Sequence, residues 1–165
     1  MSVRPYTGTT DGAAKGKREG TERLIDLCNR RWGFTNLGSW VVRDMRGKPG
    51  QLSVHATGRA ADIGYKASER DKGIEAFDWL VRHADALGIE EVHDYSFGKF
   101  GRGYRCKRKI GEKLVKVYKN EAESAGSIGG KWLHVELSPK MADDADAFES
   151  AWRSLPKPSA PVVPQ

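Results

Sequence analysis

One segment, from Ser68 to Leu87, constrains the fold more than any other part of the chain. Its apolar residues recur at the 3.6-residue spacing of a helix, and Gly88 follows at the position where a left-handed residue commonly ends one. They are Ile74, Phe77, Leu80, Val81, Ala84 and Leu87. A helix with one wide apolar face must bury that face against another layer, and we expect this layer to be a sheet.

Further helices and strands are predicted on both sides of this segment. The apolar spacing predicts helices over 21–32, with Thr21 as the N-cap, and over 143–153. β-Branched or alternating segments predict strands over 38–43, 91–97 and 132–137. Strands separated by helices of uneven length indicate an α+β fold, in which helices pack on one face of a small antiparallel sheet.

The chain divides into an arm, one domain and a tail. Residues 1–20 hold almost no large apolar side chain, which predicts a flexible N-terminal arm, and four prolines predict an extended tail over 155–165. The folded domain is expected over 21–154, with a basic insertion at 101–120. No apolar run approaches the ~20 residues that a membrane-spanning helix needs, so a transmembrane protein is excluded.

Two further features bear on where the chain is made. Cys28 and Cys106 form no pairing motif, so we expect both to be free thiols. The segment from Met1 to Lys17 lacks the 7–15-residue apolar stretch of a secretory signal. We therefore expect synthesis in the cytoplasm without a signal peptide.

The net charge of +6 is concentrated in one segment, residues 102–119. Eight basic residues against one acid give this segment a charge of +7 and leave the rest of the chain at −1. The basic residues are Arg102, Arg105, Lys107, Arg108, Lys109, Lys113, Lys116 and Lys119. Such a segment favours contact with a polyanion, whether nucleic acid, an anionic wall polymer or lipid headgroups, and a solvated loop is the alternative.

The motif most informative about chemistry is S-V-H-A-T-G-R-A-A-D-I-G, residues 53–64. His55 and Asp62 stand seven positions apart, and Gly58 allows a tight turn between them. An imidazole and a carboxylate brought together in this way suit Zn²⁺. A catalytic zinc needs three protein ligands, so a third must come from elsewhere in the chain.

His134 is the candidate for the third ligand. It lies in K-W-L-H-V-E-L, where strand alternation places Trp132, His134 and Glu136 on one face and three aliphatic residues on the other. A histidine and a glutamate on one face of a strand are costly to bury unless that face lines a site. Trp132 is therefore expected near the substrate, whereas Trp32, Trp40, Trp79 and Trp152 are expected in the core.

These two motifs resemble those of the zinc peptidases that include D-alanyl-D-alanine carboxypeptidases, phage L-alanyl-D-glutamate endopeptidases and the hedgehog domain. The family signature S-x-H-x-x-G-x-A-x-D is followed by W-x-H or H-V-D/E, and the resemblance covers about residues 35–138. Its fixed positions are filled by Ser53, His55, Gly58, Ala60, Asp62, Trp132, His134 and Glu136. The resemblance implies a hedgehog/DD-peptidase-like fold. It also implies His55, Asp62 and His134 as zinc ligands, and Arg43 as the arginine that positions the substrate.

The chain departs from the family pattern at Lys131. Many members place a catalytic Glu or Asp three residues before the second histidine, and a lysine cannot take that proton. Two residues are candidates for the catalytic role: Glu136, which could instead orient an imidazole, and His93, which lies on a neighbouring predicted strand. Asp94 is expected on the opposite face of that strand from His93.

The resemblance leads to the hypothesis of a zinc-dependent peptidase that cleaves the stem peptides of bacterial peptidoglycan. It further implies a bacteriophage endolysin or virion-associated enzyme that acts at the cell wall, released by a holin or carried in the virion. Two alternatives remain open. One is a catalytically inactive zinc-binding domain of the same fold, and the other is a nucleic-acid-binding protein that acts through residues 102–119.

Overall fold

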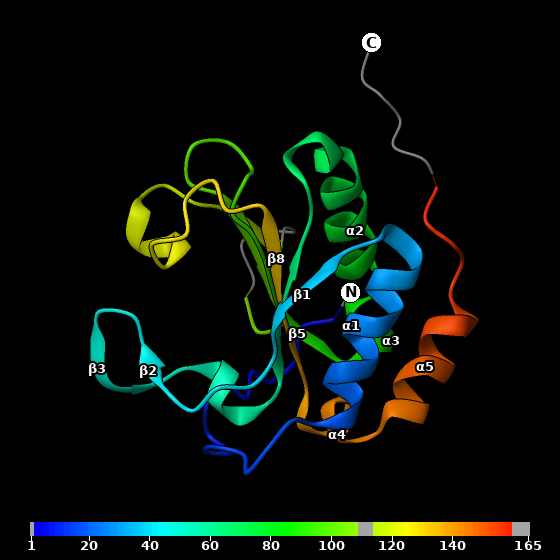
Figure 1. Cartoon of the computed structure of the whole chain (residues 1–165), viewed down its shortest axis with the longest axis horizontal. Coiled ribbons are helices and arrows are strands. Elements are labelled where there is room, and N and C mark those ends of the chain that lie inside the picture. The colour runs from blue at the N-terminus through cyan, green and yellow to red at the C-terminus, as the bar shows by residue number, and fades with distance from the viewer. Residues whose placement is uncertain (1, 109–113, 160–165) are drawn as a thin grey trace.

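A six-stranded antiparallel sheet divides the molecule, as the computed structural model of residues 2–108 and 114–159 shows (Figure 1). The strands run in the order β1-β4-β8-β5-β6-β7. Their bounds are Thr35–Gly38 for β1, Ala60–Gly64 for β4, Ile89–Asp94 for β5, Arg102–Arg105 for β6, Val115–Val117 for β7 and Trp132–Leu137 for β8. A separate hairpin of β2 (Asp44–Met45) and β3 (Lys48–Leu52) projects on one side of the sheet.

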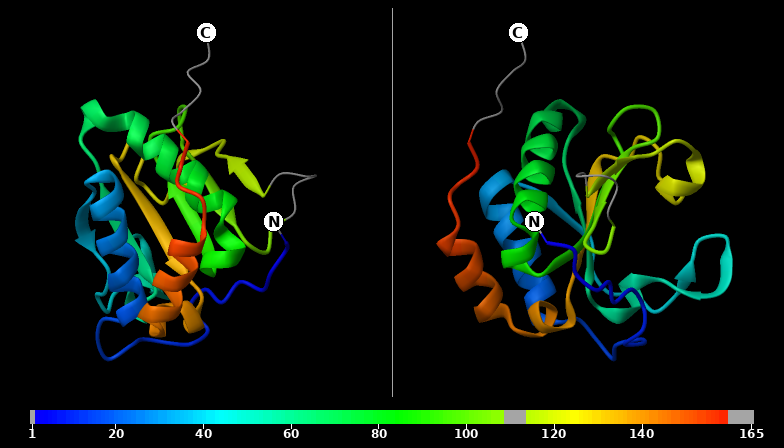
Figure 2. Two further views of the ribbon diagram at one scale, coloured as in Figure 1. Left: turned by 90° about the vertical axis from the view of Figure 1, so that its right-hand side faces the viewer. Right: turned by 180° about the vertical axis from the view of Figure 1, so that it is seen from behind.

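The helices lie on the opposite side of the sheet from this hairpin (Figures 1 and 2). Their bounds are Glu19–Trp32 for α1, Arg70–Arg82 for α2, Ala84–Leu87 for α3, Pro139–Asp143 for α4 and Ala145–Ser154 for α5. Short 3-10 turns span Val54–Thr57, Ala67–Glu69 and Glu121–Ser124. The predicted α+β fold, with helices packed on one face of an antiparallel sheet, is confirmed.

The core fills the space between the sheet and the helices. Strand β8 shows how the sequence pattern produces it: Leu133, Val135 and Leu137 are fully buried in the core, while the alternating residues face the other side. The long predicted helix is interrupted at His83, which separates α2 from α3, and Gly88 ends α3 in the left-handed conformation. Three of the four tryptophans expected in the core, at positions 32, 79 and 152, lie there.

Trp40 was expected in the core with them, and this prediction is wrong. Its ring is half-buried, and its indole N–H donates to the carbonyl of Ala14 at 3.3 Å, which ties the N-terminal segment to the loop after β1. The strand predicted over 38–43 is also wrong, because β1 ends at Gly38, whose φ of +134° breaks the extended backbone. Val41 and Val42 are exposed in the loop that follows, so β-branching there did not mark a buried strand.

Thr21 was predicted to cap α1, but the helix already begins at Glu19. Thr21 is buried, and its hydroxyl donates to the carbonyl of Gly58 at 2.8 Å. This bond ties α1 to the turn between His55 and Asp62. Both cysteines are buried free thiols, as predicted.

The N-terminal arm is where the structure differs most from the prediction. Residues 2–18 pass the ends of β5 and β8 toward the side of the sheet that carries the hairpin (Figure 2, dark blue). The backbone N–H of Arg4 donates to Cys106 at 2.8 Å, and both the N–H and the hydroxyl of Thr7 donate to the carboxylate of Glu90. Polar contacts, rather than apolar packing, hold this segment against the domain. Its low content of apolar residues therefore led to the prediction of a flexible arm.

Parts of three predicted regions lie outside the described residues: residue 1 of the arm, 109–113 of the basic insertion and 160–165 of the tail. The described part of the tail contacts the helices, because the indole N–H of Trp79 donates to Pro156 at 2.9 Å. Among the described residues, the helices are too short or too polar to cross a membrane.

Candidate metal centre

The sheet register brings the candidate residues together. Asp62 on β4 pairs with His134 on β8, which pairs with His93 on β5, so three neighbouring strands place them in one row. Glu136 pairs with Glu91 in the adjacent row. Both rows lie on the face opposite the core, because strand alternation directs every second side chain away from the helices.

His55 reaches this face from the 3-10 turn that precedes β4. Ser53 caps the turn by accepting from the N–H of His55 at 3.3 Å, and Gly58 ends it with a φ of +72°. The ligating atoms of His55, Asp62 and His134 all lie within 4.8 Å of one another. The structure therefore brings together the residues that the two motifs indicated as ligands.

Each imidazole directs one nitrogen to this group and uses the other elsewhere. His55 Nδ1 lies 3.3 Å from the carbonyl oxygen of Ser39, which leaves Nε2 facing Asp62 Oδ2 at 3.2 Å. His134 Nδ1 lies 2.9 Å from Asp62 Oδ1, and its Nε2 lies 2.9 Å from Glu136 Oε1. Hydrogen bonds on the outer nitrogen fix the orientation of a histidine ligand in metalloproteins.

Electrostatics keep Asp62 ionised. Burial raises the pKa of its carboxyl, but hydrogen bonds from His134 and His55 outweigh burial and hold the pKa far below its usual value. Two imidazole nitrogens and an ionised carboxylate are a donor set that suits Zn²⁺ and other divalent transition metals. The group could therefore hold a metal ion.

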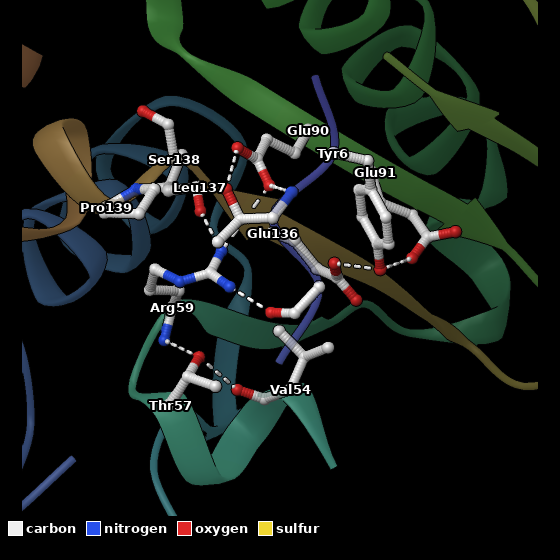
Figure 3. Close-up of polar contacts among 12 residues, drawn as sticks. Tyr6, Val54, Thr57, Arg59, Glu90, Glu91, Glu136, Leu137, Ser138 and Pro139 are labelled. Carbon is white, nitrogen blue, oxygen red and sulfur yellow. Dashed lines mark hydrogen bonds and ion pairs between the residues drawn. The ribbon is translucent and has the colours of Figure 1, made fainter. Parts of the chain in front are cut away.

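Two buried glutamates stand beside the group, and sequence reasoning identified only Glu136. Glu91 is 2% exposed and lies opposite Glu136 in the sheet register. The hydroxyl of Tyr6 lies 2.8 Å from Glu136 Oε2 and 3.0 Å from Glu91 Oε2 (Figure 3). Arg105 also donates to Glu91, through Nε at 2.8 Å. Glu91 is two positions before His93 on the same strand, so strand alternation places both on one face of the sheet. This alternation could have identified Glu91 from the sequence.

His93 is held from both sides. Its Nε2 lies 3.3 Å from Glu91 Oε1, and its Nδ1 is hydrogen-bonded to the hydroxyl of Tyr118. Its ring centroid lies 5.5 Å from that of His134. Asp94 points to the other face, as predicted, where Arg70 and Arg102 bind it at 2.8 and 3.0 Å.

Gly103 makes the contact between Tyr118 and His93 possible. A Cβ at this position would lie 1.8 Å from the Tyr118 hydroxyl oxygen and 3.2 Å from His93 Nδ1. We expect Gly103→Ala to displace Tyr118 and to lower the free energy of unfolding by about 1–3 kcal/mol, as overpacking does. Urea denaturation measures the change. Gly16→Ala is the control, since a Cβ there meets nothing within 4 Å, and an equal loss in both variants would contradict the assignment.

A cavity of about 370 Å³ is lined in part by the three candidate ligands, His55, Asp62 and His134. The hairpin contributes Arg46 and Lys48 to its lining, the loop before the hairpin contributes Arg43, and Trp132 lines it from β8. Arg43 is not on a strand as predicted; it lies in the loop before β2, where its Nη1 donates to the carbonyl of Asp44 at 3.3 Å. Trp132 stands beside the ring of Tyr95 at 5.4 Å.

Lys131 is exposed, and its ammonium group donates to the Ser96 hydroxyl at 3.2 Å. The residue is absent from the lining of the cavity beside His134. In the basic segment, Arg102, Arg105 and Lys116 are paired with Asp94, Glu91 and Glu123. These three cations are thus engaged within the chain, and the segment offers fewer free charges to a polyanion than its composition indicates.

Comparisons of the chain with protein-family models, curated proteins and solved structures found no match.

Proposed function

We propose that this chain is a zinc-dependent peptidase that hydrolyses peptide bonds in the stem peptides of bacterial peptidoglycan. The observation that carries the proposal is the convergence of His55, Asp62 and His134, with ligating atoms within 4.8 Å of one another, beside a cavity of about 370 Å³. Ligand pockets have volumes of roughly this size or larger. The substrate class comes from the resemblance of the two motifs to those of wall peptidases.

A zinc ion held by these three residues would supply Lewis acidity to the scissile carbonyl and to the attacking water. The chain's own residues would do the rest. His55 and His134 each present one defined nitrogen, because Ser39 and Glu136 occupy the other. Fixed ligand orientation means that little reorganisation is needed when the substrate binds.

We assign Glu136 to the orientation of His134 rather than to proton transfer. Its Oε1 contacts Nε2 of His134, the nitrogen of this candidate ligand that faces away from Asp62, and its Oε2 accepts from the Tyr6 hydroxyl. A carboxylate in this arrangement fixes the tautomer of the imidazole that it contacts.

We assign proton handling to His93. It lines the cavity, and Glu91 and Tyr118 hold its two nitrogens. Its Nε2, which contacts Glu91 Oε1, would take the proton that the attacking water loses and then give that proton to the leaving amine. A general acid or base contributes roughly 100- to 10,000-fold to such reactions.

Substrate binding falls to the cavity walls. Arg43 carries a charge that can engage a substrate carboxylate, and Trp132 offers an apolar face. We place the action of the enzyme at the cell wall, as part of a phage lysin or of a virion. This placement follows from the motif resemblance.

A metal-binding domain without turnover is the second candidate. The observation that favours it is Lys131, which occupies the position of the expected acid and whose ammonium group contacts Ser96. The two candidates differ in turnover and agree in metal binding.

Digestion of purified peptidoglycan separates them. We expect the zinc-loaded chain to release new amino termini or free D-alanine, detected by mass spectrometry. A chelator should abolish release and added Zn²⁺ should restore it, because hydrolysis requires the ion. Release that persists after complete metal removal would contradict the proposal, and a metal-loaded chain without any turnover would favour the second candidate.

A further inference from the structure

The N-terminal segment contributes a side chain to the metal centre. We propose that Tyr6 is a positioning residue that holds Glu136, and through it His134, in the orientation that binds metal. This inference rests on the proposed metal site. Residues 2–11, predicted from the sequence as a flexible arm, would then be part of the candidate metal site.

The contacts form a chain of three side chains. The Tyr6 hydroxyl lies 2.8 Å from Glu136 Oε2, and Glu136 Oε1 lies 2.9 Å from His134 Nε2. This leaves His134 Nδ1 facing Asp62 Oδ1 at 2.9 Å. Figure 3 shows the Tyr6 hydroxyl between the carboxylates of Glu136 and Glu91.

Tyr6 also offsets the repulsion between these two carboxylates. Both glutamates are buried and opposite each other in the sheet, so without donors the repulsion between their like charges would push the two carboxylates apart. Tyr6 and Arg105 supply the donors. The Tyr6 hydroxyl donates to Glu136 and lies 3.0 Å from Glu91, and the guanidinium of Arg105 binds Glu91 at 2.6 Å. Burial and the neighbouring carboxylates raise the pKa of Tyr6, so the phenol keeps its proton.

The segment is fixed on both sides of Tyr6, which gives the hydroxyl a defined position. Before it, Arg4 Nε binds Asp85 at 2.9 Å. After it, Thr7 binds Glu90, and the buried Arg59 binds Asp11 at 2.9 Å. The guanidinium of Arg105 stacks 4.4 Å above the Tyr6 ring, which fixes the ring plane as well.

The test compares Tyr6→Phe with Tyr65→Phe. Tyr6→Phe removes only the hydroxyl and keeps the ring under Arg105. Tyr65→Phe removes a matched buried hydroxyl, which Arg70 binds at 2.8 Å on the helix side of the sheet. Zn²⁺ affinity of the full chain is measured in competition with a chromophoric chelator. We expect a loss of about 10-fold for Tyr6→Phe, at the lower end of outer-sphere effects, and no change for Tyr65→Phe.

Two further readouts separate positioning from a general effect on the fold. The visible spectrum of the Co²⁺-loaded chain should change in Tyr6→Phe, because the orientation of His134 changes, and not in Tyr65→Phe. In a Glu136→Ala background, Tyr6→Phe should cause no additional loss of affinity, because the connecting carboxylate is gone.

A failure of the role of Tyr6 can be distinguished from a failure of the proposed function. Equal Zn²⁺ affinity and an equal Co²⁺ spectrum in Tyr6→Phe and the unaltered chain would overturn the role of Tyr6 alone. Equal losses in the two tyrosine variants would overturn it too. An unaltered chain that binds no zinc would overturn both this inference and the proposed function.

Discussion

His134→Ala is expected to lose metal binding and to lower peptidoglycan hydrolysis by about 1,000-fold or more. The substitution removes the Nδ1 atom that faces Asp62, and with it one of three candidate ligands. It also leaves Glu136, buried beside Glu91, without the imidazole that it contacts. A metal ion supplies several kcal/mol of transition-state stabilisation, and every 1.36 kcal/mol corresponds to a factor of ten in rate.

The measurement for His134→Ala is kcat/KM on soluble peptidoglycan fragments, beside Zn²⁺ affinity. His83→Ala is the matched control, because His83 lies between α2 and α3 against the Trp79 ring at 4.9 Å. The control should keep both turnover and metal. Turnover in His134→Ala within tenfold of the unaltered chain would contradict the role of this residue.

Arg59→Met is expected to lower the free energy of unfolding by about 3–5 kcal/mol, the usual cost of breaking a buried ion pair. Arg59 is completely buried, and its Nε binds Asp11 at 2.9 Å. Its Nη1 donates to the carbonyl of Leu137 at 2.6 Å (Figure 3) and lies 3.6 Å from Glu90. Without the guanidinium, the buried Glu90 and the carbonyl of Leu137 lose this donor. The N-terminal segment loses its contact with the rest of the chain at Asp11 as well.

Urea denaturation measures the loss in Arg59→Met. Arg30→Met is the control, since Arg30 pairs with Asp26 at 2.7 Å on the exposed surface of α1, where such pairs contribute less than about 1 kcal/mol. A loss in Arg59→Met no larger than in the control would contradict the structural role of this arginine.

The three candidate metal ligands could be named from the sequence because local rules determine their positions. His55 and Asp62 belong to one short motif, and the alternation of β8 assigns His134 and Glu136 to the face away from the core. Both features survive in the structure because they depend on neighbouring residues. The alternation of β5 also correctly separates His93 from Asp94.

Tyr6 could not be found in this way. Its contacts with Glu91 and Glu136 join residues far apart in sequence, and they depend on polar anchors such as Arg59 and Glu90 rather than on apolar periodicity. The ion pairs of the basic segment could not be predicted from the sequence for the same reason. Composition reveals the charge of Arg105 but not that Glu91 binds it. The strand expected over 38–43 failed because a glycine, rather than β-branching, decides where β1 ends.

Elemental analysis of the purified chain shows whether His55, Asp62 and His134 together bind a metal ion. After zinc loading and removal of excess ion, we expect about one zinc per chain in the unaltered protein and none in His134→Ala. The three converging candidate ligands and the cavity beside them are the basis of every proposed catalytic role. No zinc in the unaltered protein, or an equal zinc content in the two proteins, would rule out the proposed metal site.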